Sequence, residues 1–235
     1  LPAHDTLLAY DYYWPTGDAS ATILPSLATD WYVNETGDVW TFALQDGVKF
    51  SDGSDFTCAD AEWMINTIRT GADETGDELR RSPRGANISR VTAVTCADDL
   101  TLKIATDGQL PSLVHSLADH HFTIKNKAYF EGKLALMLDE TGPTTGPFIV
   151  DEWIPGEGIS LNRNPNYWLD PYPFLDRVES PVTGSQTASA AALRVGNIEI
   201  GGAPPAMYET LREEGFLYVT PMIAQHGFVG LQANW

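Results

Sequence analysis

The stretch WTFALQDGVKFSDGSDFTCADA, residues 40–61, carries the clearest structural signals of the chain. It opens with WTFAL, an alternating run that is typical of a half-buried strand. The Asp-Gly pair ending at Gly53 predicts a turn, because glycine adopts positive φ angles at little cost. Thr57 followed by Asp60 is close to a capping box, which predicts a helix over about residues 58–69.

Strand pairs flank this stretch on both sides. The runs at residues 23–33 and 39–44, separated by NETGD, predict a β-hairpin. Residues 88–94 and 100–104 predict a second pair around an Asp-Asp turn. Pro111 then opens a short helix, since proline is favoured at the first helical position.

The second half of the chain continues with short elements. Residues 148–153 and 158–161 predict another hairpin, and the Ala-rich residues 186–195 predict a helix that Gly196 ends. Further short elements are a helix over 208–213 and strands over 48–50, 198–200, 216–221 and 227–231. Strands and helices mix without strict alternation, which favours an α+β (mixed α/β) fold over a doubly wound parallel sheet.

The composition excludes several classes of partner. The 235 residues are 43% hydrophobic and 20% charged, as in a folded globular protein, and the net charge is -18. Nucleic acid and anionic membrane surfaces both require basic patches, so neither partner is expected. No apolar run is long enough to span a bilayer. Leu1 follows no start methionine or leader pattern, so we expect a piece of a longer protein.

Two cysteines, Cys58 and Cys96, lie in segments that we expect to be ordered. A disulfide between them is one interpretation, suited to an oxidising compartment. Two isolated buried thiols are the other interpretation, and the sequence does not decide between them. The chain has no CxxC pattern, so neither a zinc site nor a redox motif is supported.

An ordered set of motifs resembles the family 5 extracellular solute-binding proteins of ABC importers, the oligopeptide, dipeptide and nickel-binding group. The matching blocks are PSLATDW at 25–31, WTFAL and GVKFSDG within 40–53, FTCADA at 56–61, TGPF at 145–148, RNPNYW at 163–168, and AAL with GNIEI within 191–200. The departures are small: Gln45, Cys58 and Glu199 stand where the family usually has Arg, Ala and Asp.

The resemblance implies the fold and the role of the chain. It implies that residues 1–235 form most of the N-terminal lobe of a type II periplasmic-binding-protein-like protein, with a mixed sheet, antiparallel hairpins and the second lobe absent. Sub-regions of about 25–140 and 141–235 are expected within it. The implied role is capture of a small solute, most simply a peptide, in an inter-lobe cleft and its delivery to ABC permease subunits. A monomeric, periplasmic or extracellular protein without a cofactor is expected, and a lipid anchor in the full-length protein is one alternative.

The resemblance also points to segments that contact the solute. The implied ligand-binding residues are Arg80, Arg81, His120, His121, Phe122, Asn234 and Trp235. The two arginines can meet a ligand carboxylate, or they can be solvated loop charges. The large aromatic residues Trp31, Trp40, Tyr167 and Trp168 are expected to cover the sheet or fill the core.

Metal binding and catalysis find little support in the sequence. His115, His120 and His121 do not have the HxxxH spacing, and no nearby Cys or Glu completes a ligand set, so we predict no metal site. No G-x-S-x-G, Walker or G-x-G-x-x-G motif is present, and we predict a binding protein rather than an enzyme. The alternatives are a non-transport peptide-binding or sensory module and a hydrolase with paired carboxylates.

Overall fold

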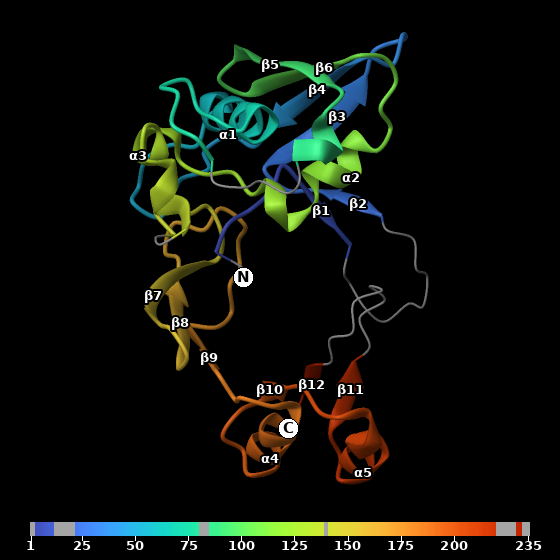
Figure 1. The fold of residues 1–235 in the computed structure, drawn as a ribbon, viewed down its shortest axis with the longest axis vertical. Helices are drawn as coiled ribbons and strands as arrows, with labels where there is room; N and C mark the ends of the chain where they lie inside the picture. Colours follow the sequence, from blue (N-terminus) through green and yellow to red (C-terminus); the bar gives the residue numbers. More distant parts are fainter. Residues whose placement is uncertain (1–2, 12–21, 80–84, 139–140, 220–228, 232–235) are drawn as a thin grey trace. The chain divides into compact units, whose positions relative to one another are not determined.

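The computed structural model describes residues 3–11, 22–79, 85–138, 141–219 and 229–231 (Figure 1). The chain divides into two compact units, Leu1–Trp153 with Ile159–Glu179, and Ile154–Gly158 with Ser180–Trp235. These limits differ from the expected sub-regions 25–140 and 141–235. Among the described residues no helix is long and apolar enough to cross a membrane.

The elements are short and follow one another closely along the chain. The strands are β1 Leu8–Tyr10, β2 Ile23–Pro25, β3 Ala28–Val33, β4 Val39–Leu44, β5 Val91–Asp98, β6 Thr101–Thr106, β7 Phe148–Ile154, β8 Gly158–Arg163, β9 Arg177–Pro181, β10 Ile200–Gly201, β11 Leu217–Val219 and β12 Val229–Leu231. The α-helices are α1 Cys58–Thr70, α2 Leu113–Leu117, α3 Lys127–Phe130, α4 Gln186–Arg194 and α5 Tyr208–Glu213. The 3₁₀ turns are η1 Gly85–Ile88, η2 His120–Phe122, η3 Leu134–Leu138 and η4 Pro205–Met207.

An antiparallel sheet with the strand order β3-β4-β6-β5 is the centre of the first unit (Figure 1). The predicted hairpin over 23–44 is confirmed as β3 and β4, with Trp31 opposite Phe42 and Val33 opposite Trp40. The second predicted pair is confirmed as β5 and β6. Trp31, Trp40 and Trp168 pack against the core, as the sequence predicts.

Helix α1 lies against the sheet and is fixed at both ends. Its predicted capping box is present, because the Thr57 N–H donates to Asp60 Oδ2 at 3.0 Å. Gly71 ends the helix in the left-handed region at φ 79°. Cys58, the first helical residue, is joined by a disulfide to Cys96 in β5, with 5.8 Å between the two Cα atoms. The structure therefore selects the disulfide over two free thiols.

The motif loops of the first unit converge on one another although they are far apart in the sequence. The Ser51 N–H donates to the Thr144 carbonyl at 2.8 Å, and Asn164 Nδ2 donates to the Gly146 carbonyl at 2.8 Å. A Cβ at Gly146 would lie 2.5 Å from the Ala3 carbonyl carbon, so only glycine allows this approach of two backbones. Three of the blocks quoted for the family resemblance, GVKFSDG, TGPF and RNPNYW, thus meet in one loop assembly.

The second unit has a smaller described core around Ala190, Ala203 and Leu211. The predicted helix over 186–195 is confirmed as α4, whose cap Ser185 accepts a hydrogen bond from the Ala188 N–H at 3.1 Å. The short sheet of this unit has the order β10-β12-β11. The predicted helix over 208–213 is confirmed as α5.

Two predicted strands differ from the structure. Residues 48–50 form no strand, because only an isolated bridge between Lys49 and Asp55 pairs them. The strand predicted over 198–200 is instead β10 at Ile200–Gly201, where its pairing with β12 begins. Residues 220–221 and 227–228 of the last predicted strands lie outside the described residues.

Candidate ligand-binding site

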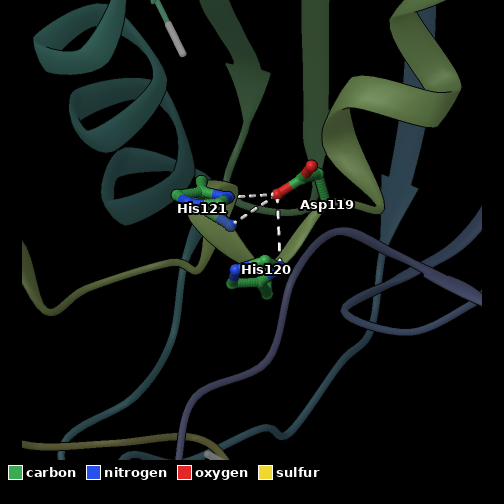
Figure 2. A group of neighbouring side chains, drawn as sticks. All are labelled: Asp119, His120 and His121. Atoms are coloured by element: carbon green, nitrogen blue, oxygen red, sulfur yellow. Dashed lines mark hydrogen bonds and ion pairs between the residues drawn. The ribbon is translucent and has the colours of Figure 1, made fainter. Parts of the chain in front are cut away.

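The described part of the predicted ligand-binding set lies in turn η2. Asp119 directly precedes the turn. Its Oδ1 accepts a hydrogen bond from the His121 N–H at 2.9 Å and lies 2.6 Å from the Nδ1 atom of the same histidine (Figure 2). His120 Nδ1 lies 3.4 Å from the same oxygen. Figure 2 shows both imidazole rings gathered around one carboxylate, and we call Asp119, His120 and His121 the Asp-His-His cluster.

The Asp-His-His cluster is open to solvent on one side. The side chain of His120 is 81% exposed, whereas those of His121 and Asp119 are 33% and 25% exposed. The two rings lie 3.9 Å apart between centroids. Partial burial works to raise the pKa of Asp119, but the hydrogen bonds from the His121 N–H and ring outweigh it and lower that pKa.

The third predicted histidine does not join this group. His115 is exposed on α2, and its ring stacks on Tyr10 with 6.0 Å between centroids. Asp119 supplies a third possible metal-ligand atom beside the two histidines, a role for which the sequence analysis found no nearby Cys or Glu. Its position directly before a turn is a capping signal that could have identified it.

Phe122, the last residue of η2, is placed in the hydrophobic core with 1% of its surface exposed. The Phe122 ring therefore anchors the turn in the hydrophobic core, and His120 and His121 provide the polar side-chain atoms of the turn. The other residues that the resemblance implies, Arg80, Arg81, Asn234 and Trp235, lie outside the described residues.

A buried polar group around Asp5 was not anticipated from the sequence. Asp5 Oδ2 accepts a hydrogen bond from Trp168 Nε1 at 2.9 Å, and the Asp5 N–H donates to Thr145 Oγ1 at 3.3 Å. Burial raises the pKa of Asp5 to about 6, although hydrogen bonds between its carboxylate and the Trp168 and Thr145 side chains act to lower it. Burial and the Asp5 charge also raise the pKa of Tyr167.

Next to Asp5 lie two basic groups in a poorly hydrated environment. Both ring nitrogens of His4 are buried, and burial, aided by the Lys125 charge, lowers the pKa of His4 to about 3, although a hydrogen bond with the Thr141 backbone acts to raise it. Burial lowers the pKa of Lys125 to about 8, and its ammonium lies 6.0 Å from the centroid of the Phe130 ring. Burial and the nearby Lys125 charge therefore favour the neutral form of the His4 ring in the folded protein.

A pocket of about 440 Å³ opens between α1 and β5. Its walls include Trp63, Thr67, Asp73 and Val94. None of the described ligand-binding candidates in η2 lines it. The candidate site therefore remains the surface at the Asp-His-His cluster rather than this pocket.

Comparison with known proteins identifies a matching family of solute-binding proteins. The model of the bacterial extracellular solute-binding proteins, family 5 middle region, matches residues 22–234. Protein XP55 of Streptomyces lividans is 29% identical over 214 residues, which are 89% of this chain and 36% of XP55. The glutathione-binding protein GsiB of Escherichia coli K12 is 25% identical over 202 residues, 85% of this chain and 38% of GsiB. The chain thus spans little more than a third of these relatives.

Solved structures agree on the fold. NikA from Brucella suis, in complex with Fe(III)-EDTA, superposes with a TM-score of 0.76 at 22% identity, over 93% of this chain and 42% of NikA. The periplasmic binding protein DppA from Helicobacter pylori, in complex with a peptide, gives a TM-score of 0.76 at 24% identity, over 93% of this chain and 44% of DppA. At this identity the likeness concerns the fold alone.

Proposed function

This chain belongs to the bacterial extracellular solute-binding proteins of family 5, and we propose that it is part of the solute-capturing component of an ABC-type importer. The observation that carries the proposal is the family match over residues 22–234. The protein captures a small solute outside the cytoplasm and presents it to permease subunits in the membrane. It acts as a monomer in the periplasm or at the cell exterior.

A short peptide is the proposed solute. GsiB is named a glutathione-binding protein, and a further relative, MppA of Escherichia coli K12, is named a murein peptide-binding protein. MppA is 26% identical over 219 residues, which are 87% of this chain and 40% of MppA. Peptides carry the carboxylates and amides that polar side chains at a cleft recognise by hydrogen bonds.

Binding rather than catalysis fits the carboxylates that the fold buries. Asp60 accepts hydrogen bonds from the N–H groups of Thr57 and Lys127, and Asp5 accepts one from Trp168. Each of these carboxylates is occupied by donors of the fold itself, so each supports a structural role. A general acid or base would instead have to reach a substrate within hydrogen-bond distance.

We assign the solute contacts of this chain to His120 and His121, together with Arg80, Arg81, Asn234 and Trp235. The exposed imidazole of His120 supports this assignment, because its polar atoms are available to a ligand. Phe122 contributes by holding the turn in place, since its side chain belongs to the core.

The test is ligand-dependent thermal stabilisation of the longest form of the protein in which this chain occurs. A ligand at 100 times its Kd stabilises the native state by about 2.7 kcal/mol, which raises the melting temperature by several degrees. We expect this rise with glutathione or with di- to pentapeptides, and no rise with oligosaccharides. Stabilisation by oligosaccharides alone would overturn the peptide assignment, and the absence of any stabilisation by these solutes would overturn solute capture.

A further inference from the structure

The Asp-His-His cluster places three metal-ligating side chains together on a surface. One ligand atom from each of Asp119, His120 and His121 lies within 4.8 Å of the others. Two imidazole nitrogens face one carboxylate oxygen in this arrangement (Figure 2). The sequence pattern alone did not indicate it, because Asp119 was not counted among the candidate ligands.

The cluster is held in position by the fold. The His121 N–H donates to Asp119 Oδ1 at 2.9 Å, which fixes the carboxylate at the start of η2. Phe122 at the end of the turn is buried in the core, so the turn as a whole is anchored. A site whose ligands are already ordered loses less entropy when it binds an ion.

One of the separations between ligand atoms already matches that around a coordinated ion, and the others need a small adjustment. Zinc binds imidazole nitrogen and carboxylate oxygen at about 2.0–2.2 Å in a tetrahedral arrangement, so two ligand atoms on one ion lie about 3.3–3.6 Å apart. The 3.4 Å between His120 Nδ1 and Asp119 Oδ1 already matches this separation. The 2.6 Å between His121 Nδ1 and the same oxygen is a hydrogen bond, and this separation must open by about 0.7–1.0 Å when an ion replaces the proton.

Electrostatics favour a cation at this place. The chain has a net charge of -18. Among the described residues, no Lys or Arg forms an ion pair with Asp119, whose partners within 4 Å are the His120 and His121 rings. Two imidazoles and one carboxylate suit zinc, nickel and copper rather than magnesium or calcium, which prefer oxygen ligands alone.

We propose that Asp119, His120 and His121 form a protein-built binding site for one divalent transition-metal ion of the Zn²⁺, Ni²⁺ and Cu²⁺ group. The three side chains leave further coordination positions to water or to an external ligand. The site shares His120 and His121 with the proposed solute contacts, but its test contains no solute. A failure to bind metal would therefore leave the proposed solute capture standing, because that proposal rests on the family match.

The test is calorimetric titration with Zn²⁺ of the tag-free, metal-free protein, in the longest form in which this chain occurs. We expect saturable binding of one ion per chain, weakening as the pH falls through the range in which histidine titrates, because ligation requires unprotonated nitrogens. The absence of saturable binding up to about 1 mM Zn²⁺ would overturn the proposal.

Two variants locate the site, and a third is a matched control. His120→Ala removes an exposed ligand without disturbing the core, and Asp119→Asn keeps a cap acceptor while removing the charge. Each is expected to weaken Zn²⁺ binding at least about tenfold, or about 1.4 kcal/mol. His115→Ala is the control, because this exposed histidine stacks on Tyr10 outside the cluster. Equal affinities in all four proteins would assign the ion to another place and overturn the proposal.

A spectroscopic readout separates ligation from a change in stability. Electron paramagnetic resonance of the Cu²⁺-loaded chain is expected to show coupling to nitrogen that His120→Ala reduces and His115→Ala leaves unchanged. An identical spectrum in the wild-type chain and His120→Ala would contradict the assignment of His120 as a ligand.

Discussion

Asp5 and Asp119 are two carboxylates of the same unit in opposite environments. Asp5 is enclosed, accepts a hydrogen bond from Trp168 Nε1 and has a pKa raised to about 6 by burial. Asp119 is a quarter exposed, and the hydrogen bonds from His121 lower its pKa although burial alone would raise it. Both are acidic residues with aromatic or imidazole partners, and only their surroundings distinguish them.

The difference shows what each group can contribute. A carboxylate that the fold has supplied with donors can stabilise the protein, but it offers nothing to a ligand. A carboxylate at the surface with exchangeable imidazole partners stabilises little, and its partners remain available for an ion or a solute. Substitutions around Asp5 should therefore alter stability, and those around Asp119 should alter binding.

The largest expected effect is the loss of the Trp168 hydrogen bond. Trp168→Phe keeps an aromatic ring but removes the indole N–H that donates to the Asp5 carboxylate. Hydrogen bonds to charged groups contribute about 1.5–3 kcal/mol, so we expect the free energy of unfolding to fall by about 2–3 kcal/mol in urea titrations. Trp153→Phe is the control, because Trp153 is 57% exposed and should change stability by less than about 0.5 kcal/mol. Similar losses in both variants would mean that the enclosed carboxylate has no special role.

The pH dependence of stability sharpens the contrast further. Between about pH 4 and 6 the folded chain keeps a proton on Asp5 that the unfolded chain releases, so this group stabilises less as the pH rises. In the same range the unfolded chain holds a proton on His4 that the folded chain lacks, so this group stabilises less as the pH falls. The two dependences oppose each other.

Single substitutions should separate the contributions of Asp5 and His4 to the pH dependence of stability. In Asp5→Asn only the His4 term remains, so the free energy of unfolding should fall, relative to the wild-type profile, by about 1.4 kcal/mol for each pH unit from 6 to 4. In His4→Gln the deviation should have the opposite sign. Urea titrations at several pH values measure both, and parallel profiles in the three proteins would contradict the burial of these groups.

The cap at η2 should give a smaller effect. Asp119→Ala removes the acceptor of the His121 N–H, which should lower the free energy of unfolding by about 1 kcal/mol. Asp119→Asn retains an acceptor and should cost less than about 0.5 kcal/mol. Thermal denaturation of the two variants distinguishes them, and an equal loss would show that the charge rather than the cap is what stabilises the turn.

The smallest expected effect on stability belongs to His120→Ala. Its side chain is 81% exposed and makes one weak ion-pair contact, so the free energy of unfolding should change by less than about 0.5 kcal/mol. A loss above about 1 kcal/mol would place His120 with the structural groups around Asp5, and the contrast between the two carboxylates would no longer hold.

The same contrast explains which features could be predicted from the sequence. The hairpin of β3 and β4 and the start of α1 depend on alternation, turn residues and the Thr57 cap, all of which are local signals. The Asp5 group joins residues that are 140 and 163 positions apart, so no local pattern reveals it. The residues 48–50 had a strand-like composition, but a strand also requires a pairing partner, which only the fold supplies.

The predicted ligand-binding residues came from family resemblance rather than from chemistry. That route selected His120 and His121, which lie in one turn, and their contact with a solute stays a prediction. It could not show that Phe122 faces the core. Alternation and spacing are weak guides within a three-residue turn, because side chains leave it in several directions. Asp119, which organises the turn, precedes the set that the resemblance selected.

The bond between Cys58 and Cys96 has a consequence for proteolysis. It closes a covalent ring across a sequence separation of 38. A protease that cuts one peptide bond between these two residues opens the ring but releases no fragment. The two halves of the nicked chain would migrate together in a gel until a reducing agent is added. In an oxidising compartment the first unit can therefore lose the continuity of its backbone and still remain a single molecule.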